Sequence, residues 1–380
     1  MSEQEAKIEI HRGLKDVVFD RSRVCFIDGR AGELRYRGYS IHDLAERSTF
    51  EETCYLLLKG ELPTRAQLQA FDAELKAARV LPGPIYEVVR TVKDAHPMDV
   101  LRTAVSALAA FDPETADNSL EATLRKGIRL TSQVPMIVAA HEAIRNGREP
   151  VAPDPTLAHA ANFLWMLKGA RPSAEAARLM DVDMILHAEH GSNASSFAAR
   201  VVAGTEANLH AAITAAVAAL SGPAHGGAAE NVMKMAMEIG DPANAAEYVK
   251  RKRAAREPVM GFGHRVYRAE DPRARHMRAG VERLSREMGQ PHWYQILQAL
   301  VEAMKPYARH GVNVNVDFYA GVVYYLNGIR EDLFVPIFAV GRVPGWTVQV
   351  MEQLENNILI RPLTLYNGPA PREYVPIEAR

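Results

Sequence analysis

Two histidines that stand three positions apart, His187 and His190, are the first residues whose spacing suggests chemistry. If the segment is helical, this spacing places both imidazoles on one helix face. Imidazoles at helical spacing can ligate zinc, but the zinc motif His-Glu-x-x-His separates its histidines by four positions. We therefore favour recognition of an anion over metal ligation. A pair of hydrogen-bonded histidines in a packed helix is the alternative.

A third histidine, His225, follows a buried Ala-rich segment and stands just before a helix that we expect to begin near Ala228. The positive end of that helix dipole disfavours the imidazolium and predicts a neutral ring. A neutral imidazole can donate a hydrogen bond to a developing enolate without protonating the substrate beforehand. His225 is therefore a candidate for stabilising an enolate.

A glycine-containing loop precedes a fourth histidine, His264, and is followed by several arginines. The loop is Val259-Met260-Gly261-Phe262-Gly263, and the arginines are Arg265, Arg268, Arg273 and Arg275. The glycines allow the backbone to approach a ligand closely, and guanidinium groups fork onto carboxylate or phosphate. Because so many cations are costly to hold together without an anion, the segment predicts an anion site.

One carboxylate, Asp317, stands among apolar and aromatic neighbours after Asn315. Burial would raise its pKa above the ~3.9 of a free aspartate and make it a stronger base. The other interpretation is a helix N-cap, because a helical pattern follows Asp317. The residues by themselves leave both readings open.

Further cations complete the set of candidates. Arg342 lies between glycines and Arg361 precedes a proline, and either one is also compatible with an ordinary surface position. Lys250 and Arg251 begin a basic run that reaches Arg256 directly before the glycine loop. This run is either a solvated helix face or a contact for coenzyme phosphates.

The elements that must position these residues are nearly all helical. Apolar residues alternate around a turn at 28–32, which predicts a small N-terminal β-hairpin, and from Ile41 onward they recur at three and four residue steps. We expect helices near 50–59, 65–78, 98–110, 119–144, 155–168, 173–202, 206–220, 228–239, 242–255, 271–288, 292–309, 317–326 and 345–358. We expect loops at 221–223, 258–263, 306–311 and 341–345, where Pro and Gly concentrate.

Bulk composition narrows the class of protein. Of 380 residues, 48 % are hydrophobic, and 45 Lys and Arg balance 46 Asp and Glu, so neither nucleic acid nor an anionic membrane is the expected partner. The two cysteines, Cys25 and Cys54, predict no disulfide framework. The longest apolar run, 211–220, is about half the ~20 residues of a membrane span. The polar residues 1–13 lack a signal pattern, so we expect a cytoplasmic location.

Together, these motifs and their order resemble the citrate synthase family from about Gly13 to the C-terminus. The resemblance implies that His225, His264 and Asp317 are the catalytic residues of a Si-type acyltransferase. It implies that His190, Arg273, Arg342 and Arg361 bind oxaloacetate and that His187 lines the same pocket. For the coenzyme A thioester, a co-substrate and not a bound cofactor, it implies contacts from Arg268, residues 259–263, Asn315, Lys250 and Arg251. No metal is expected.

The same resemblance implies a large domain formed by residues 1–222 and 328–380, and a small mobile domain formed by residues 223–327. It implies a homodimer of the compact bacterial and archaeal type, in which Arg361 reaches the partner's site. Asp317 would remove a methyl proton from acetyl-CoA while His225 donates to the thioester carbonyl. The resulting enol or enolate would attack oxaloacetate, polarised by His264, and water would then release citrate and coenzyme A.

Three other functions are compatible with these residues. A 2-methylcitrate synthase, which uses propionyl-CoA, would share every catalytic residue, and Val314 and Ala320 are departures from the usual family pattern that bear on acyl preference. A non-catalytic helical binding protein would release no coenzyme A. A metal-dependent hydrolase using His187, Glu189 and His190 would be inhibited by a chelator.

Overall fold

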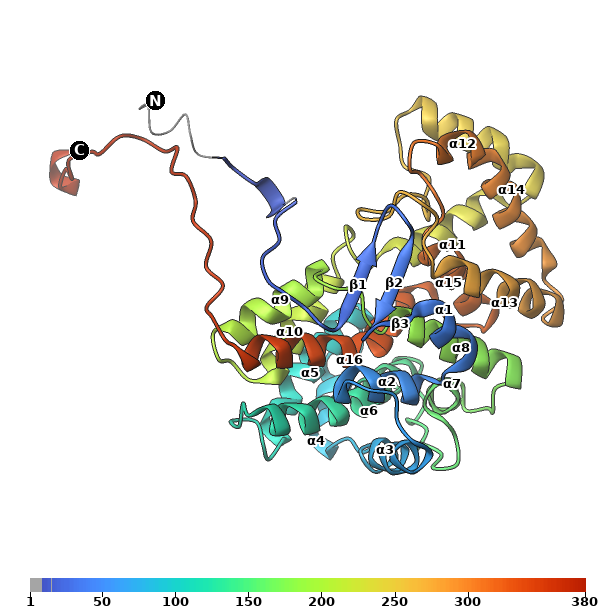
Figure 1. Cartoon of the computed structure of the whole chain (residues 1–380), viewed down its shortest axis with the longest axis horizontal. Coiled ribbons are helices and arrows are strands. Elements are labelled where there is room, and N and C mark those ends of the chain that lie inside the picture. The colour runs from blue at the N-terminus through green and yellow to red at the C-terminus, as the bar shows by residue number, and fades with distance from the viewer. Residues whose placement is uncertain (1–8, 15) are drawn as a thin grey trace.

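The computed structural model describes residues 9–14 and 16–380, and helices dominate this part of the chain (Figure 1). The strands are β1 (Cys25–Asp28), β2 (Glu33–Tyr36) and β3 (Tyr39–Ser40). The helices are α1 (Ile41–Arg47), α2 (Phe50–Lys59), α3 (Arg65–Ala77), α4 (Gly83–Thr91), α5 (Pro97–Leu108), α6 (Leu120–Arg145), α7 (His159–Lys168), α8 (Ala174–His187), α9 (Ala194–Gly204), α10 (Leu209–Leu220), α11 (Ala228–Ile239), α12 (Ala245–Ala254), α13 (Ala274–Glu287), α14 (Pro291–Ala308), α15 (Asp317–Leu326) and α16 (Phe334–Glu355). The all-α prediction with a small hairpin is confirmed.

The N-terminal hairpin pairs β1 with β2 in antiparallel register, from Cys25 opposite Tyr36 to Asp28 opposite Glu33, and β3 adds a short third strand. Its turn is closed by Asp28, whose Oδ1 accepts from the backbone N–H groups of residues 30 and 31. The tip packs tightly against the segment after His264, since a Cβ added at Gly29 would lie 2.3 Å from the carbonyl oxygen of Val266. The hairpin therefore supports the loop that carries His264.

Helix α16 lies at the centre of the larger group of helices and packs against α6, α8, α9 and α10. An 18-residue window within Glu331–Glu355 has a mean hydropathy of 1.3, long and apolar enough to span a membrane, but 94 % of this window is buried. Such burial is typical of the central helix of a hydrophobic core. The apolar run 211–220 falls in α10, which is also a core helix, as expected.

Helices α11 to α15 form a second group at one end of the molecule, drawn in yellow and orange in Figure 1. They pack mainly on each other, through α11 with α15, α13 with α14 and α15, and α12 with α14. Contacts to the first group are made mainly with α8 and α16, and also with α1 and the 3-10 helix Glu331–Leu333. The division at residues 223–327 stays a prediction, and this grouping is compatible with it.

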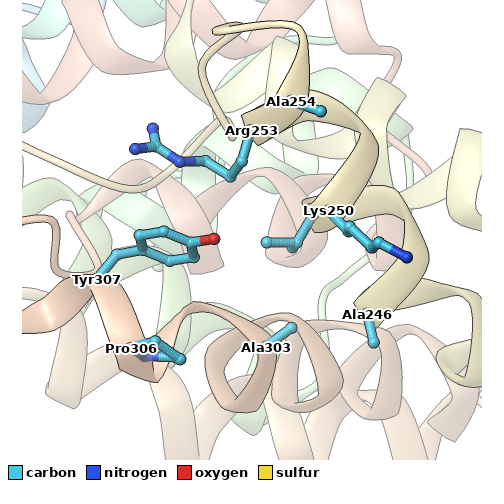
Figure 2. A pocket seen from close by; sticks show the side chains of 8 residues that line it. Ala246, Lys250, Arg253, Ala254, Ala303, Pro306 and Tyr307 are labelled. Carbon is cyan, nitrogen blue, oxygen red and sulfur yellow. The ribbon is translucent and has the colours of Figure 1, made fainter.

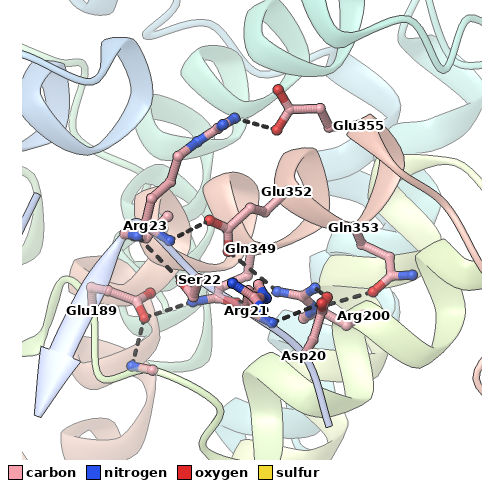
Figure 3. A network of polar contacts seen from close by, with 12 residues as sticks. Asp20, Arg21, Ser22, Arg23, Glu189, Arg200, Gln349, Glu352, Gln353 and Glu355 are labelled. Atoms are coloured by element: carbon pink, nitrogen blue, oxygen red, sulfur yellow. Dashed lines mark hydrogen bonds and ion pairs between the residues drawn. The ribbon is translucent and has the colours of Figure 1, made fainter.

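The segment before β1 is tied to α9 and α16 by a buried arginine (Figure 3). Arg200 of α9 is 1 % exposed and its guanidinium contacts Asp20, Gln349, Glu352 and Gln353. A buried cation is stable only when its donors are satisfied, and here four side chains share them. This network anchors residues 20–23 on the C-terminal half of α16.

The single helix predicted over 173–202 is wrong, because two helices occupy this range. α8 ends at His187 and α9 begins at Ala194. Asn193 caps α9, with Oδ1 accepting from the N–H groups of residues 195 and 196, and Gly191 adopts a φ of +58°. A strong N-cap and a left-handed glycine end one helix and start another. The chain therefore turns between His187 and His190.

The loop predicted at 341–345 is also wrong, because these residues lie inside α16, which begins at Phe334 and not near 345. Gly341 and Gly345 serve close packing here. A Cβ at Gly341 would lie 3.2 Å from the Cα of Met184, and the approach at Gly345 is closer still. Three smaller differences are that Pro306 lies within α14, that α7 begins at His159, and that α4 had no predicted counterpart.

Candidate active site

The contact between α8 and α16 brings the first two candidates together. Arg342, 1 % exposed, donates from Nε to the carbonyl oxygen of His187, and its guanidinium lies over the ring of Phe338, 4.7 Å from the centroid. Nη1 of Arg342 has no hydrogen-bond partner among the described residues. A buried guanidinium with an unused donor is costly unless an anion binds there. Arg342 is thus arranged to receive an anionic ligand.

His190 does not share a helix face with His187, since it follows the end of α8; that part of the prediction was wrong. Nevertheless, it enters the same region from the loop. Its Nε2 lies 3.1 Å from the hydroxyl of Tyr267, and its ring centroid lies 5.3 Å from that of His264. Burial and then the charge of Arg273 hold its pKa well below the usual 6.5. His190 is therefore a neutral side chain beside His264.

The proton of His264 is placed by the backbone. Nδ1 accepts from the N–H groups of Val266, at 3.0 Å, and Tyr267, at 3.1 Å. Nδ1 must then be unprotonated, so the neutral ring carries its hydrogen on Nε2 and can donate from there. Burial, followed by the charge of Arg273, lowers the pKa of His264 to about 4. His264 is a fixed neutral donor at pH 7.

His225 is fixed in the opposite tautomer. Its Nε2 accepts from the backbone N–H of Ser195 at 3.2 Å and lies 2.8 Å from the Ser195 hydroxyl, which Trp346 also contacts. The neutral ring therefore carries its hydrogen on Nδ1. Burial and then Arg342 lower its pKa to about 4. The predicted neutral state agrees with this direction, although burial and a guanidinium are the causes and not the helix dipole.

Arg273, 3 % exposed, is oriented by a carboxylate two residues before it. Nε donates to Asp271 Oδ1 at 2.9 Å and Nη2 to Oδ2 at 2.7 Å. Burial lowers the pKa of Arg273, but the negative charge of Asp271 outweighs this effect, so the pKa of Arg273 is raised. Oδ2 of Asp271 also accepts from the backbone N–H of Val316, which precedes Asp317. Asp271 therefore connects the arginine to the start of α15.

Asp317 is the first residue of α15 and not its N-cap, because Val316 holds that position and no side chain caps the helix. Burial raises the pKa of Asp317, while the charges of His187 and Arg273 act against this shift. The N-cap interpretation is therefore wrong. A carboxylate with a raised pKa beside histidines and arginines has the properties of a general base.

The glycine loop packs against the segment before α15. Phe262 forms a bridge with Val314, and Asn315 donates to the carbonyl oxygens of Gly261, from its backbone N–H, and of Gly263, from its side-chain amide. Gly261 and Gly263 have φ values of +77° and +90°, which side chains rarely adopt. Val259 and Gly261 are buried, Met260, Phe262 and Gly263 are partly exposed, and Arg268 is exposed, with its side chain open to solvent.

The basic run on α12 divides into paired and open cations. Arg251 pairs with Glu238 at 2.6 Å and Lys252 with Glu257 at 2.7 Å. Lys250, which lies 3.7 Å from Glu247, and Arg253 line a cleft of about 570 Å³ between α12 and α14, where the guanidinium of Arg253 lies over the ring of Tyr307 (Figure 2). Of the two basic residues expected to contact coenzyme A, Lys250 lines this cleft and Arg251 is occupied by an ion pair.

Arg361 is not brought to the other site residues. It lies exposed in the segment after α16, which runs away from the body of the protein without regular structure until a short 3-10 helix at Ile377–Ala379 (Figure 1). Several large apolar side chains of this C-terminal arm (residues 357–380) are exposed, including Leu363 and Tyr374 at 85 % and 81 %. Such exposure is unusual for a chain segment that stays in water.

Within residues 9–14 and 16–380, no group of three or more His, Cys, Asp or Glu side chains is arranged to hold a metal ion. The triple of His187, Glu189 and His190 does not form such a group. Glu189 instead turns inward, where its Oε1 accepts from the N–H of Gly191 at 2.6 Å and from Gln349 at 2.9 Å.

Sequence reasoning passed over the residues that orient the candidates. Asp183 contacts His187, and Ser195 contacts His225. Tyr267 contacts His190, and Asp271 contacts Arg273. Only two of these four residues could have been found from their spacing in the sequence. Asp183 stands four positions before His187, and Asp271 stands two positions before Arg273. The contacts of Ser195 and Tyr267 join residues that are 30 and 77 positions apart.

Comparison with known proteins agrees with this arrangement. The family model described as "Citrate synthase, C-terminal domain" matches residues 13–363. The chain is 43 % identical to the citrate synthase of Haloferax volcanii, over 98 % of this chain and 99 % of that protein. It is 40 % identical to 2-methylcitrate synthase 1 of Corynebacterium glutamicum, over 98 % of this chain and 99 % of that protein.

A solved structure extends the likeness to three dimensions. One such structure is citrate synthase from Thermoplasma acidophilum in a ternary complex with carboxymethyl coenzyme A and oxaloacetate. It superposes with a TM-score of 0.92 at 32 % identity, covering 98 % of this chain and all of that one. Fold, site and relatives define a mainly helical acyltransferase. The chain belongs to the citrate synthase family.

Proposed function

We propose that this protein condenses the acetyl group of acetyl-CoA with oxaloacetate and hydrolyses the resulting thioester to citrate and coenzyme A. The observation that carries the proposal is the pair of oppositely fixed neutral imidazoles, His225 with its hydrogen on Nδ1 and His264 with its hydrogen on Nε2, together with Asp317, whose pKa is raised. Enolisation of the thioester needs a base and a donor, and attack on the ketone needs a second donor; these three residues supply them.

In the first step, Asp317 removes a proton from the methyl group of the thioester while Nδ1–H of His225 donates to the thioester oxygen. The raised pKa of Asp317 makes it a stronger base than an exposed aspartate. The neutral state of His225 suits a donor that stabilises an enolate without transferring its proton beforehand.

In the second step, the enol or enolate attacks the ketone carbon of oxaloacetate, and Nε2–H of His264 donates to the ketone oxygen. Arg273 and Arg342 hold the carboxylates, with His190 beside them, and Arg361 of a partner subunit completes the set. The open donor on Arg342 supports its role. Water then cleaves the citryl thioester, so the site must first exclude water and then admit it.

Both the dimer and the domain motion belong to the proposal. The exposed apolar side chains of the C-terminal arm favour burial against a second copy, which would bring Arg361 to the partner's site. Residues 223–327 would close over the bound dicarboxylate, with hinge positions at Gly222, Gly226 and Gly227. Scattering profiles with and without oxaloacetate measure the mass and the closure together. A monomer, or identical profiles, would contradict these parts.

The coenzyme would contact the backbone of residues 259–263, Asn315, Arg268 and Lys250. The two left-handed glycines, and the position of Lys250 on the cleft between α12 and α14, support this assignment. Arg251 is the weaker member, because Glu238 already neutralises it. A Lys250→Ala variant should raise KM for acetyl-CoA, whereas Arg251→Ala should change it less.

The deciding experiment is the release of coenzyme A thiol with oxaloacetate and either acetyl-CoA or propionyl-CoA. We expect release that depends on oxaloacetate and falls 10²–10⁴-fold, roughly, in Asp317→Asn, as for loss of a general base. Asp241→Asn, an exposed aspartate at the start of a 3-10 helix, is the matched control. No release from either thioester would contradict the proposal.

The second candidate is 2-methylcitrate synthesis, because curated relatives at 40 % identity carry that name. A higher kcat/KM with propionyl-CoA would select it. Full activity in the presence of a chelator would support the predicted absence of a metal. The cytoplasmic location also stays a prediction, which cell fractionation tests.

A further inference from the structure

The hydroxyl of Tyr36, on strand β2 of the N-terminal hairpin, lies against the backbone at the end of α8. It lies 3.1 Å from the carbonyl oxygen of Ile185, 3.2 Å from that of Leu186 and 2.9 Å from that of Glu189. It also accepts from the backbone N–H of Glu189 at 3.3 Å. All four residues are fully buried. Burial raises the pKa of Tyr36 above the usual 10, so the hydroxyl keeps its hydrogen and can donate.

This hydroxyl joins the backbone on both sides of His187. The last turn of a helix leaves carbonyl oxygens without N–H partners, and buried oxygens of this kind are costly unless a side chain donates to them. Tyr36 faces two such oxygens before His187 and the carbonyl and N–H of Glu189 after it. The single hydroxyl hydrogen is shared among the three carbonyl oxygens, while the hydroxyl oxygen holds the N–H of Glu189. Tyr36 therefore fixes the direction in which the chain leaves α8.

The turn after α8 is also held by α16 and by strand β1. Gln349 of α16 donates to Oε1 of Glu189 at 2.9 Å, and the same oxygen accepts from the N–H of Gly191 at 2.6 Å. Ile27 of β1 approaches Gly191, where an added Cβ would lie 3.4 Å from Cδ1 of the isoleucine. The turn is thus enclosed between the hairpin and α16, and its backbone has little freedom to move.

The tip of the same hairpin supports the loop that carries His264. The backbone N–H of Arg268 donates to the carbonyl oxygen of Gly29 at 2.7 Å. The rings of His264 and His190 lie beside each other, with centroids 5.3 Å apart. One hairpin therefore supports both imidazoles, His264 through its tip and His190 through Tyr36. The spacing of the two rings depends on this common support.

We propose that Tyr36 is a positioning residue for binding of the dicarboxylate. Its hydroxyl fixes the turn at residues 187–191, so that His190 is held at a set distance from His264. This inference rests on the proposed function for the identity of the ligand. Tyr36 does not touch the ligand, because it is fully buried and its hydroxyl is already engaged by the backbone. Its effect passes through the positions of the two histidines.

Steady-state kinetics of Tyr36→Phe test this role, because the variant keeps the ring in the core and removes only the hydroxyl. We expect KM for oxaloacetate to rise about tenfold, as for loss of a buried hydrogen bond, and KM for acetyl-CoA to stay within about twofold. The rate constant kcat should change less than KM for oxaloacetate. Tyr39→Phe is the matched control, since this tyrosine of the same hairpin is exposed, and neither KM should change. An unchanged KM for oxaloacetate in folded Tyr36→Phe would overturn the inference.

Hydrogen exchange of the full-length protein, measured by mass spectrometry without substrate, gives a readout that does not depend on activity. The peptide that spans residues 186–193 should exchange faster in Tyr36→Phe than in the native protein, because its backbone loses a buried partner. Peptides from α4, in the larger group of helices, should exchange equally in the two proteins. A uniform increase along the whole chain, or no increase at residues 186–193, would contradict a local positioning role.

A second variant keeps the inference testable if Tyr36→Phe does not fold. Ile27→Ala removes the side chain of β1 that approaches Gly191, and it should raise KM for oxaloacetate and the exchange at residues 186–193 in the same way. Native values of both would refute the role of the hairpin. Native protein that releases no coenzyme A would contradict the proposed function, whereas the exchange at residues 186–193 would still decide whether Tyr36 fixes the turn.

Discussion

Gly345 of α16 packs directly against the carbonyl oxygen of Ala188, and a Cβ added to this glycine would lie 2.0 Å from that oxygen. Ala188 stands between His187, which ends α8, and His190 in the following loop. The absence of a side chain at position 345 therefore lets α16 approach the turn that separates two candidate ligand-binding histidines. The oxygen belongs to the main chain, so it cannot move aside as a flexible side chain can.

We predict that Gly345→Ala destabilises the protein by about 3 kcal/mol or more, because overpacking against a backbone group forces α8 and α16 apart. The free energy of unfolding in urea measures this effect. Gly83→Ala is the matched control, since an added Cβ there meets no atom within 4 Å, and a small stabilisation of about 0.4–1 kcal/mol is expected. Equal stability of the two variants would disprove the packing argument.

Arg200 gives a second prediction about stability. Replacement by Met should cost about 3–5 kcal/mol, because it leaves Glu352 and two glutamines of α16 without their common donor. Limited proteolysis should then cut the segment around Asp20 sooner than in the native protein. Arg283→Met, which removes an exposed ion pair with Glu175, should cost less than about 1 kcal/mol. A similar loss in both variants would contradict the role of the buried network.

His159 predicts a loss of stability in acid. Burial, followed by the charge of Arg79, lowers its pKa to about 3 from the usual 6.5. Between these values the unfolded chain binds a proton that the folded protein does not, so stability is full above pH 6.5 and falls as the pH decreases towards 3. His159→Phe should reduce the slope of the free energy of unfolding against pH by up to about 1.4 kcal/mol per pH unit. Urea unfolding at pH 5 and pH 7.5 measures it; an unchanged slope would count against the prediction.

Glu189 should act in the opposite direction. Burial raises its pKa to about 7 from 4.5, so the folded protein binds the extra proton between these values. The stability gained from this proton is present below pH 4.5 and is lost as the pH rises through 7. Glu189→Gln, which keeps an oxygen for the N–H of Gly191, should be relatively more stable than the native protein at pH 8 than at pH 5. The same difference at both pH values would show that Glu189 does not titrate on unfolding.

Local sequence patterns determined most of the secondary structure and identified the kinds of side chain that form the candidate site. Three and four residue periodicity predicted the positions of most helices, and the alternation around residues 28–32 predicted the hairpin, because both depend on neighbours close in the chain. The raised pKa of Asp317 was one of two interpretations that the sequence left open, and the neutral state of His225 was predicted. The cause of the neutral state of His225 was not predicted, because Arg342, which lowers its pKa, is far from His225 in the sequence.

Only the tertiary structure decided where α8 ends and why α16 continues through Gly341, Pro344 and Gly345. Glycine and proline read as loop signals locally, yet here the glycines allow two helices to pack at a distance that a side chain would prevent. The tautomer of His225 likewise depends on a contact with Ser195, 30 positions away, whereas that of His264 is set by the nearby N–H groups of Val266 and Tyr267. The sequence by itself determined which groups could do the chemistry, whereas the tertiary structure decided how they are brought together, because that depends on packing between distant segments.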